Sequence, residues 1–194
     1  MNPMPYRMNT RYLEVNNTVF WVNGKYSGIY SHMAKQMIGQ VNAMLSHHSK
    51  VHLIRFDLRL YKYTDNNEVV SKFNRILFKW LKRKYGLKRV GFVWCREMET
   101  AKQQHYHYAL MLDGHKVRHP HDILIKVKDV WETNLQGSEY TPKRCYYNLK
   151  RECEASIQRA VWRISYLAKT RGKGYKQSQT KNYGTSRIRI NNNS

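Results

Sequence analysis

Apolar residues recur at three- and four-residue spacing over the segment that follows Asp65, and this pattern constrains the fold more than any other feature of the chain. They are Val69, Val70, Phe73, Ile76, Leu77, Trp80 and Leu81. This spacing places them on one side of an α-helix, which must pack that side against an apolar surface. Asp65 is a suitable N-terminal cap, and Gly86 is a suitable residue at the C-terminal end. The chain is therefore expected to fold around a core on which this helix packs.

Other segments have either helical periodicity or the β-rich composition of strands. Further helices are expected at residues 27–48, 122–131 and 154–169, and strands at residues 51–63, 89–99 and 105–112. A short segment, 100–104, separates the last two strands and suits a hairpin, and 137–142 is expected to be a loop. The order of these elements indicates an α+β fold with an antiparallel central sheet flanked by helices.

The charge of the chain indicates its class of partner. With 194 residues, of which 35 are Lys or Arg and 13 are Asp or Glu, the chain has a formal net charge of +22. Such a surplus on a foldable sequence favours nucleic acid as the partner, and the 15 tyrosines and 5 tryptophans favour single strands. We expect an N-terminal extension or short hairpin at residues 1–25, one domain at 26–170, and a basic, mobile tail at 171–194.

Features that would indicate another compartment are missing from the sequence. No apolar run approaches the length of a membrane span, and the first residues have no signal-peptide core. We therefore expect no membrane partner and a cytoplasmic location. Cys95, Cys145 and Cys153 are odd in number and have no metal-binding spacing, so they are expected to be reduced thiols.

Two histidines one residue apart begin the strand expected at 105–112. In a strand His105 and His107 point to the same face, and in a symmetrical hairpin Glu97 shares that face. Two imidazoles and a carboxylate suit Mg²⁺ or Mn²⁺, although zinc also accepts these ligands. Glu99 replaces Glu97 if the register shifts by two. Taken alone, each of these residues is more typical of a solvated strand face than of a metal site.

The last expected helix places a tyrosine and a lysine away from its apolar stripe. The stripe consists of Ile157, Val161, Ile164 and Ala168. Tyr166 and Lys169 project together on another side. The ordinary pKa of a phenol is about 10, and a nearby cation favours the nucleophilic phenolate. The pair could serve phosphoryl transfer, or Tyr166 could be an exposed amphipathic residue.

Other residues could take these roles. Tyr146 and Tyr147 precede Lys150 and are alternative nucleophiles. A second histidine pair, His119 and His121, lies between a strand and a helix, where a loop role is favoured.

Together these residues resemble the HUH endonuclease superfamily, and in particular the inovirus-type Gp2 replication proteins of filamentous phages, prophages and phage satellites. The resemblance covers about residues 50–190 and rests on Trp94-Cys-Arg-Glu97, HYHYALML at 105–112, Ser165-Tyr-Leu-Ala-Lys169 and Tyr183-Gly-Thr-Ser-Arg187. Arg55-Phe-Asp57-Leu-Arg59-Leu60 would be the family's first strand motif. One departure is Tyr106, because the superfamily more often has an aliphatic residue between the histidines.

The resemblance implies a Rep fold of the HUH/RRM-like type and a rolling-circle replication initiator. Tyr166 would attack single-stranded origin DNA, leaving a free 3′-hydroxyl for a polymerase and a 5′-phosphotyrosine, and a later transesterification would rejoin the strand. Glu97, His105 and His107 would hold Mg²⁺ or Mn²⁺, and Lys169 would position the phosphate. A host helicase and polymerase would be partners.

Further basic residues are candidates for contacts with the DNA backbone. They are Arg55, Arg59, Lys82, Arg83, Lys84, Arg163, Arg171, Lys173, Lys176 and Arg187. The alternatives are a non-catalytic nucleic-acid-binding protein and a related transposase or relaxase of the same superfamily.

Overall fold

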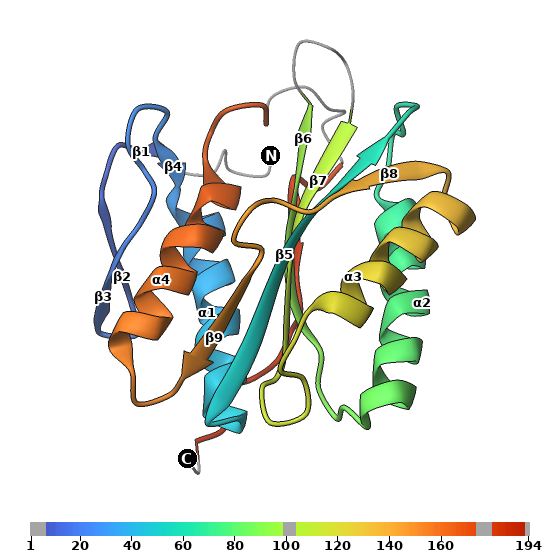
Figure 1. Ribbon diagram of the computed structural model, residues 1–194. Helices are drawn as coiled ribbons and strands as arrows, with labels where there is room; N and C mark the ends of the chain where they lie inside the picture. Colours follow the sequence, from blue (N-terminus) through green and yellow to red (C-terminus); the bar gives the residue numbers. More distant parts are fainter. Residues whose placement is uncertain (1–6, 99–103, 174–179, 193–194) are drawn as a thin grey trace.

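An antiparallel sheet lies between two helical layers in the computed structural model, which describes residues 7–98, 104–173 and 180–192 (Figure 1). The strands are paired in the order β10-β6-β7-β5-β8, and β9 pairs with the same edge of β5 as β8. Their bounds are β5 (Lys50–Leu60), β6 (Gly91–Met98), β7 (Gln104–Asp113), β8 (Gly137–Tyr140), β9 (Tyr146–Lys150) and β10 (Tyr183–Thr185). The expected α+β class with an antiparallel sheet is confirmed.

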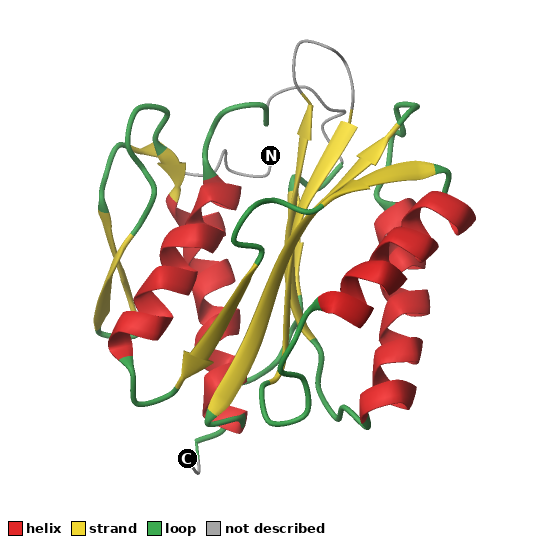
Figure 2. Cartoon of the chain, in the orientation of Figure 1, coloured by secondary structure: helices red, strands yellow, loops and turns green. Residues whose placement is uncertain are grey.

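Helices cover both faces of the sheet (Figure 2). In the view of Figure 1, α1 and α4 lie to the left of the sheet, and α2 and α3 lie to the right. Their bounds are α1 (Ser31–His47), α2 (Glu68–Tyr85), α3 (His121–Lys128) and α4 (Glu154–Ser165). A π-helical turn, η1 (Asp129–Asn134), continues α3, and a 3₁₀ turn, η2 (Tyr166–Ala168), continues α4.

Alternation along the central strands divides the buried side chains into two cores. Leu53 of β5 and Met111 of β7 belong to the core under α1 and α4. Phe56 and Tyr108 belong to the other core, where their rings stack with centroids 4.9 Å apart beneath α2. Because neighbouring residues of a strand point to opposite faces, charged side chains at alternate positions lie on the same face of the sheet.

The segment from residue 7 to residue 30 forms part of the fold. Strands β2 (Tyr12–Val15) and β3 (Thr18–Trp21) make a hairpin. Of the two predictions for this region, an extension or a short hairpin, the hairpin is therefore confirmed. Leu13 and Phe20 of this hairpin are buried in the core under α1 and α4. Two short strands, β1 (Arg7–Met8) and β4 (Ile29–Tyr30), pair with each other.

The C-terminal segment differs from the expected mobile tail. β10 pairs with β6 in antiparallel register, with Tyr183 opposite Cys95. Without this strand the backbone groups at the edge of β6 would lack partners, which explains why a polar segment becomes part of the sheet. The expected loop at 137–142 likewise contains β8, which pairs with β5.

Helix α2 confirms its predicted apolar side and C-terminal residue, but its first turn differs. Asp65 is not its cap, because the helix begins at Glu68 and is preceded by Asn67. Phe73 and Leu77 are fully buried, and Gly86 ends the helix with φ +59°. Glycine suits this left-handed position because it has no Cβ to strain.

We expect Gly86→Ala to lower the free energy of unfolding by about 1 kcal/mol, because alanine is strained in the left-handed conformation. A Cβ at Gly86 would have Lys116 Nζ as a neighbour at 3.6 Å, so the cost comes from the backbone and not from a clash. Gly39 provides the matched control, since it lies inside α1 with open space around it. Gly39→Ala should raise stability by roughly 0.5–1 kcal/mol. Urea unfolding measures both, and equal shifts of one sign would contradict this account.

Candidate active site

The register of the central strands gathers charged residues on the face that α4 covers. In the β6–β7 hairpin Glu97 lies opposite His105, as the symmetrical register predicted. On the other side of β7, Asp57 of β5 lies opposite His107. These four side chains therefore start from neighbouring positions on three strands of one sheet face.

His107 is at the centre of this group, between two carboxylates. Its Nε2 lies 3.0 Å from Oε2 of Glu97, and its Nδ1 lies 2.7 Å from Oδ1 of Asp57. All three side chains are largely buried, with 14% of His107, 14% of Asp57 and 9% of Glu97 exposed. The contact with Asp57 fixes the orientation of the imidazole, as a carboxylate commonly does for a metal-binding histidine.

The role of Asp57 was not predicted from the sequence. The signal was present, since Arg55, Asp57 and Arg59 alternate with apolar residues in β5 and so mark a polar face. The spacing of residues within β5 could not show which residue of a neighbouring strand lies opposite Asp57.

Two buried cations complete the ionic cluster, and both differ from expectation. Arg55 was predicted to contact DNA, but its guanidinium is buried, contacts the Asp57 carboxylate and places Nη2 2.9 Å from Nδ1 of His107. Lys173 was predicted to do the same, but its buried ammonium contacts Glu97 and donates to the carbonyl of Lys169 at 2.5 Å. Buried carboxylates need cationic partners, and these two residues supply them.

The cluster shifts the titration of its members. Burial raises the pKa of Glu97, but the hydrogen bond with His107 and the charge of Lys173 outweigh it and lower the pKa to about 2. The same balance, with His107 and Arg55 as partners, lowers the pKa of Asp57 to about 2. Burial lowers the pKa of His107, but hydrogen bonds with Asp57 and Glu97 reverse the effect and raise it above its ordinary value. The imidazole is thus stabilised as a donor to both carboxylates.

The donor atoms fit a divalent cation in part. A neutral imidazole that donates from Nδ1 to Asp57 turns the lone pair of Nε2 toward Oε2 of Glu97. These two acceptors, 3.0 Å apart, repel unless a proton lies between them or one metal ion binds both as adjacent ligands. His105 starts from the same face, across from Glu97. Within the part of the chain that the structure describes, no three His, Cys, Asp or Glu side chains are already arranged to hold a metal ion. Glu99, the alternative ligand, lies outside the described residues.

Tyr166 lies beside this cluster. Val161, Ile164 and Ala168 are fully buried, so the predicted phase of α4 is confirmed. The Tyr166 side chain is 39% exposed, and its ring meets the His107 ring edge to face with centroids 6.1 Å apart. Helix α4 gives way to the tighter turn η2 at this residue. The structure thus brings the predicted nucleophile to one of the predicted ligands.

Lys169 accompanies Tyr166 as expected. Its Nζ lies 5.2 Å from the centre of the Tyr166 ring, in a cation–π contact. The ammonium therefore lies close enough to the phenol to contact a phosphate that approaches it.

The alternative nucleophiles lie elsewhere. Tyr146 and Tyr147 belong to β9 and pair with Ile54 and Leu53 of β5. These positions are three and four residues from Asp57 along β5, or roughly 10–13 Å. The Tyr146 ring packs against His52 instead, with centroids 5.4 Å apart.

The remaining predicted DNA contacts are spread over the molecule. Lys82 and Arg83 are exposed on α2, across the sheet from Tyr166, and Lys84 beside them forms an ion pair with Asp122 at 2.6 Å. The guanidinium of Arg59 lies 5.4 Å from the ring centre of Tyr140. Arg171 and Arg187 are exposed, Arg163 is half-buried, and Lys176 lies outside the described residues.

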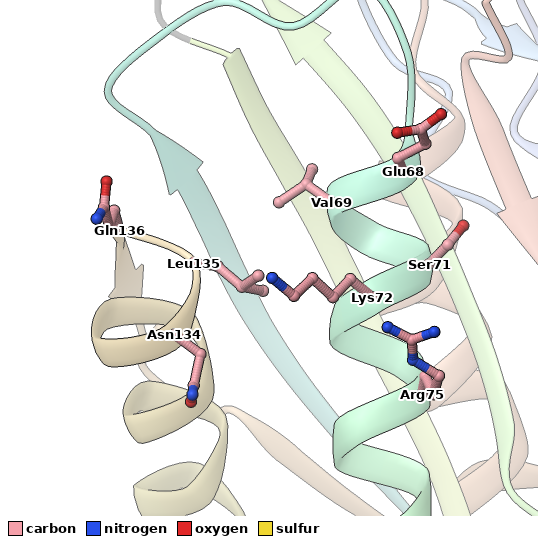
Figure 3. Close-up of a pocket in the computed structure, with 8 residues that line it drawn as sticks. All are labelled: Glu68, Val69, Ser71, Lys72, Arg75, Asn134, Leu135 and Gln136. Carbon is pink, nitrogen blue, oxygen red and sulfur yellow. The ribbon is translucent and has the colours of Figure 1, made fainter.

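A hollow between α2 and the end of η1 lies on the far side of the sheet (Figure 3). It is lined by Glu68, Val69, Ser71, Lys72, Arg75, Asn134, Leu135 and Gln136. Its lining has one carboxylate and no imidazole, so it lacks the groups that the cluster around His107 offers.

None of the helices in the described ranges is long and apolar enough to cross a membrane.

Comparison with known proteins relates the chain to a protein family. The family model described as the YagK/YfjJ C-terminal domain matches residues 14–186. No curated protein and no solved structure matches the chain. The matched segment begins within β2 and includes β3, the cluster around His107 and Tyr166.

Proposed function

The chain belongs to the YagK/YfjJ C-terminal domain family, and we propose that it is a metal-dependent DNA strand transferase of the HUH type. It would initiate rolling-circle replication by nicking single-stranded origin DNA and rejoining it. Single-stranded DNA would be its substrate, and a host polymerase and helicase would act on the nicked product.

The observation that carries this proposal is the contact between His107 and Tyr166. An exposed phenol next to a buried histidine–carboxylate pair is the arrangement that phosphoryl transfer to tyrosine needs, with the nucleophile and the charge-stabilising group on separate elements. A structural role alone would not require an exposed tyrosine beside the cluster.

The reaction can be written with the residues of this chain. The Tyr166 phenol loses its proton to solvent, and its oxygen forms a bond to the scissile phosphorus as the bond to the 3′-oxygen breaks. The 3′-oxygen takes up a proton, and the 5′-phosphate stays on the enzyme. Rejoining reverses these steps. A bound Mg²⁺ or Mn²⁺ would offset the charge that develops on the phosphate oxygens.

Each neighbouring residue has a part in this scheme. Glu97 and His107, together with His105 from the same sheet face, would hold the cation. Asp57 orients the His107 ring through Nδ1. Lys169, which already lies against the Tyr166 ring, would bind the phosphate that approaches the phenol.

A covalent-adduct assay tests the proposal. The protein is incubated with Mn²⁺ and a random-sequence library of single-stranded DNA labelled at the 3′ end, and the products are separated on a denaturing gel. We expect label attached to the protein, and none when EDTA replaces Mn²⁺. With 5′-labelled DNA the label should leave as a free, shortened strand.

The site of attachment gives a second readout. Mass spectrometry of the protease-digested adduct should find the nucleotide on the peptide that contains Tyr166. Attachment to Tyr146 or Tyr147 would overturn the assignment of the nucleophile. If the random-sequence library gives no adduct at all, the proposed activity is overturned.

A further inference from the structure

Exposed aromatic side chains gather where the β2–β3 hairpin lies along α4. Trp21 and Tyr12 are 59% and 49% exposed, and Trp162 of α4 is 42% exposed. Tryptophan rings cost free energy in water, so a group of them on a surface indicates a binding site. In Figure 1 the hairpin lies beside α4, whose C-terminal end leads to Tyr166.

The hairpin is fixed to α4 by specific hydrogen bonds. The backbone N–H of Trp21 donates to Oε1 of Gln158 at 3.0 Å, and Nε2 of Gln158 donates to the carbonyl of Trp21 at 2.8 Å. The N–H of Asn23 donates to Oγ of Ser165 at 2.9 Å. The aromatic face of the hairpin therefore keeps one position relative to the helix.

Residue spacing extends this face to the nucleophile. Gln158 and Trp162 are four residues apart on one side of α4, about 6 Å along its axis, and Tyr166 follows four residues later where η2 continues the helix. Trp21 is held next to the first of them, and Tyr166 is the last. The exposed rings thus form a row that runs from the hairpin to the proposed active site.

One part of the row has a structural explanation and another does not. Tyr12 and Trp21 meet edge to face across the hairpin, with centroids 5.5 Å apart, and such a pair stabilises a hairpin. Trp162 has no ring partner among the residues that the structure describes. Its exposed ring is therefore free of ring contacts within the described residues and can stack on a ligand.

Cations accompany these rings. Arg11 and Arg159 are exposed next to Tyr12 and Gln158 in the sequence, and Lys169 lies over the Tyr166 ring. Glu14 of β2 is an exposed acidic residue nearby, but the chain as a whole has a net charge of +22. Exposed rings together with exposed cations on neighbouring residues suit unstacked bases joined by phosphates.

We propose that Trp21, Trp162 and Tyr166 form a stacking surface that binds single-stranded DNA and leads it along α4 to the nucleophile. This inference rests on the proposed function for its end point, because the row stops at the tyrosine that would attack the strand. The bases would stack on the rings without sequence preference, while the cations would hold the backbone. A duplex keeps its bases paired and could not use the surface in this way.

Binding without cleavage tests the surface. Anisotropy of fluorescein-labelled oligothymidylate is measured in EDTA at one fixed salt concentration. Trp162→Leu is expected to weaken binding roughly tenfold, because leucine keeps an apolar side chain but has no ring face. Trp162→Phe restores a ring and is expected to bind within about threefold of the unchanged protein.

Two controls separate stacking from charge and folding. Trp80→Leu alters a partly buried tryptophan on α2, across the sheet, and should leave the affinity within about twofold. Affinity for a duplex of matched length should be equal for the unchanged protein and Trp162→Leu. Equal losses for single strands and duplex, or no loss with Trp162→Leu, would overturn the stacking surface.

These outcomes are distinct from those of the adduct assay. If Trp162→Leu weakens binding but no adduct forms, the stacking surface is supported and the proposed nicking activity is overturned. If an adduct forms but the affinity of Trp162→Leu is unchanged, the proposed activity is supported and the stacking surface is overturned.

Discussion

Tyr166→Phe is expected to reduce formation of the covalent protein–DNA adduct by at least roughly a thousandfold, because removal of a nucleophile eliminates the step that it carries out. Phenylalanine keeps the ring that lies edge to face with His107, with centroids 6.1 Å apart, so the local packing should persist. Affinity for single-stranded DNA should stay within about twofold, because the stacking face remains. Quantitative gels with Mn²⁺ measure the first effect and anisotropy measures the second.

The alternative tyrosines provide matched controls. Tyr146→Phe and Tyr147→Phe make the same chemical change in β9, away from the His107 ring. Each should form the adduct at nearly the normal rate. If either abolishes the adduct while Tyr166→Phe forms it, the nucleophile has been assigned to the wrong element.

Glu97→Gln is expected to act on stability and on activity together. The carboxylate of Glu97 contacts the buried ammonium of Lys173, whose side chain is fully buried, and it lies 3.0 Å from Nε2 of His107. An amide removes the charge that compensates these cations, and breaking a buried ion pair costs about 3–5 kcal/mol. Urea unfolding should show a loss near the lower end of this range, since Lys173 keeps its bond to the carbonyl of Lys169. Adduct formation should fall below detection, because a carboxylate ligand is lost.

A double-mutant cycle separates the two roles of Glu97. Lys173→Met removes the buried ammonium, so Glu97→Gln combined with Lys173→Met should be more stable than the sum of the single losses predicts. The double variant should still form no adduct. Additive losses of stability would show that the contact between Glu97 and Lys173 contributes nothing, and recovery of the adduct would exclude Glu97 as a ligand.

Much of the fold could be predicted because it depends on local periodicity. The apolar side of α2, the phase of α4 and the opposition of Glu97 and His105 follow from repeats of a few residues and from a short connection. Strands β8, β9 and β10 were not predicted. They are short and polar, and their stability comes from pairing with β5 and β6 rather than from a pattern of their own.

The candidate site likewise contains residues that local sequence patterns predict and a residue that only strand pairing reveals. The sequence predicted Glu97, His105, His107 and Tyr166 as candidates, because their spacing sets their direction on a strand or helix and the resemblance to the HUH superfamily joins them into one site. It did not show that Asp57 contacts His107, since these residues are fifty positions apart and meet through the pairing of β5 with β7.

The sequence by itself determined the secondary structure of the central elements, the antiparallel class of the sheet and the surplus of positive charge, because periodicity and composition are properties of the chain alone. Only the tertiary structure decided which charges remain at the surface. Arg55 and Lys173 look like any other cations in the sequence, but strand pairing and the path of the C-terminal segment bury them against Asp57 and Glu97. A buried carboxylate needs a cation at short range, and long-range chain contacts determine which one it receives.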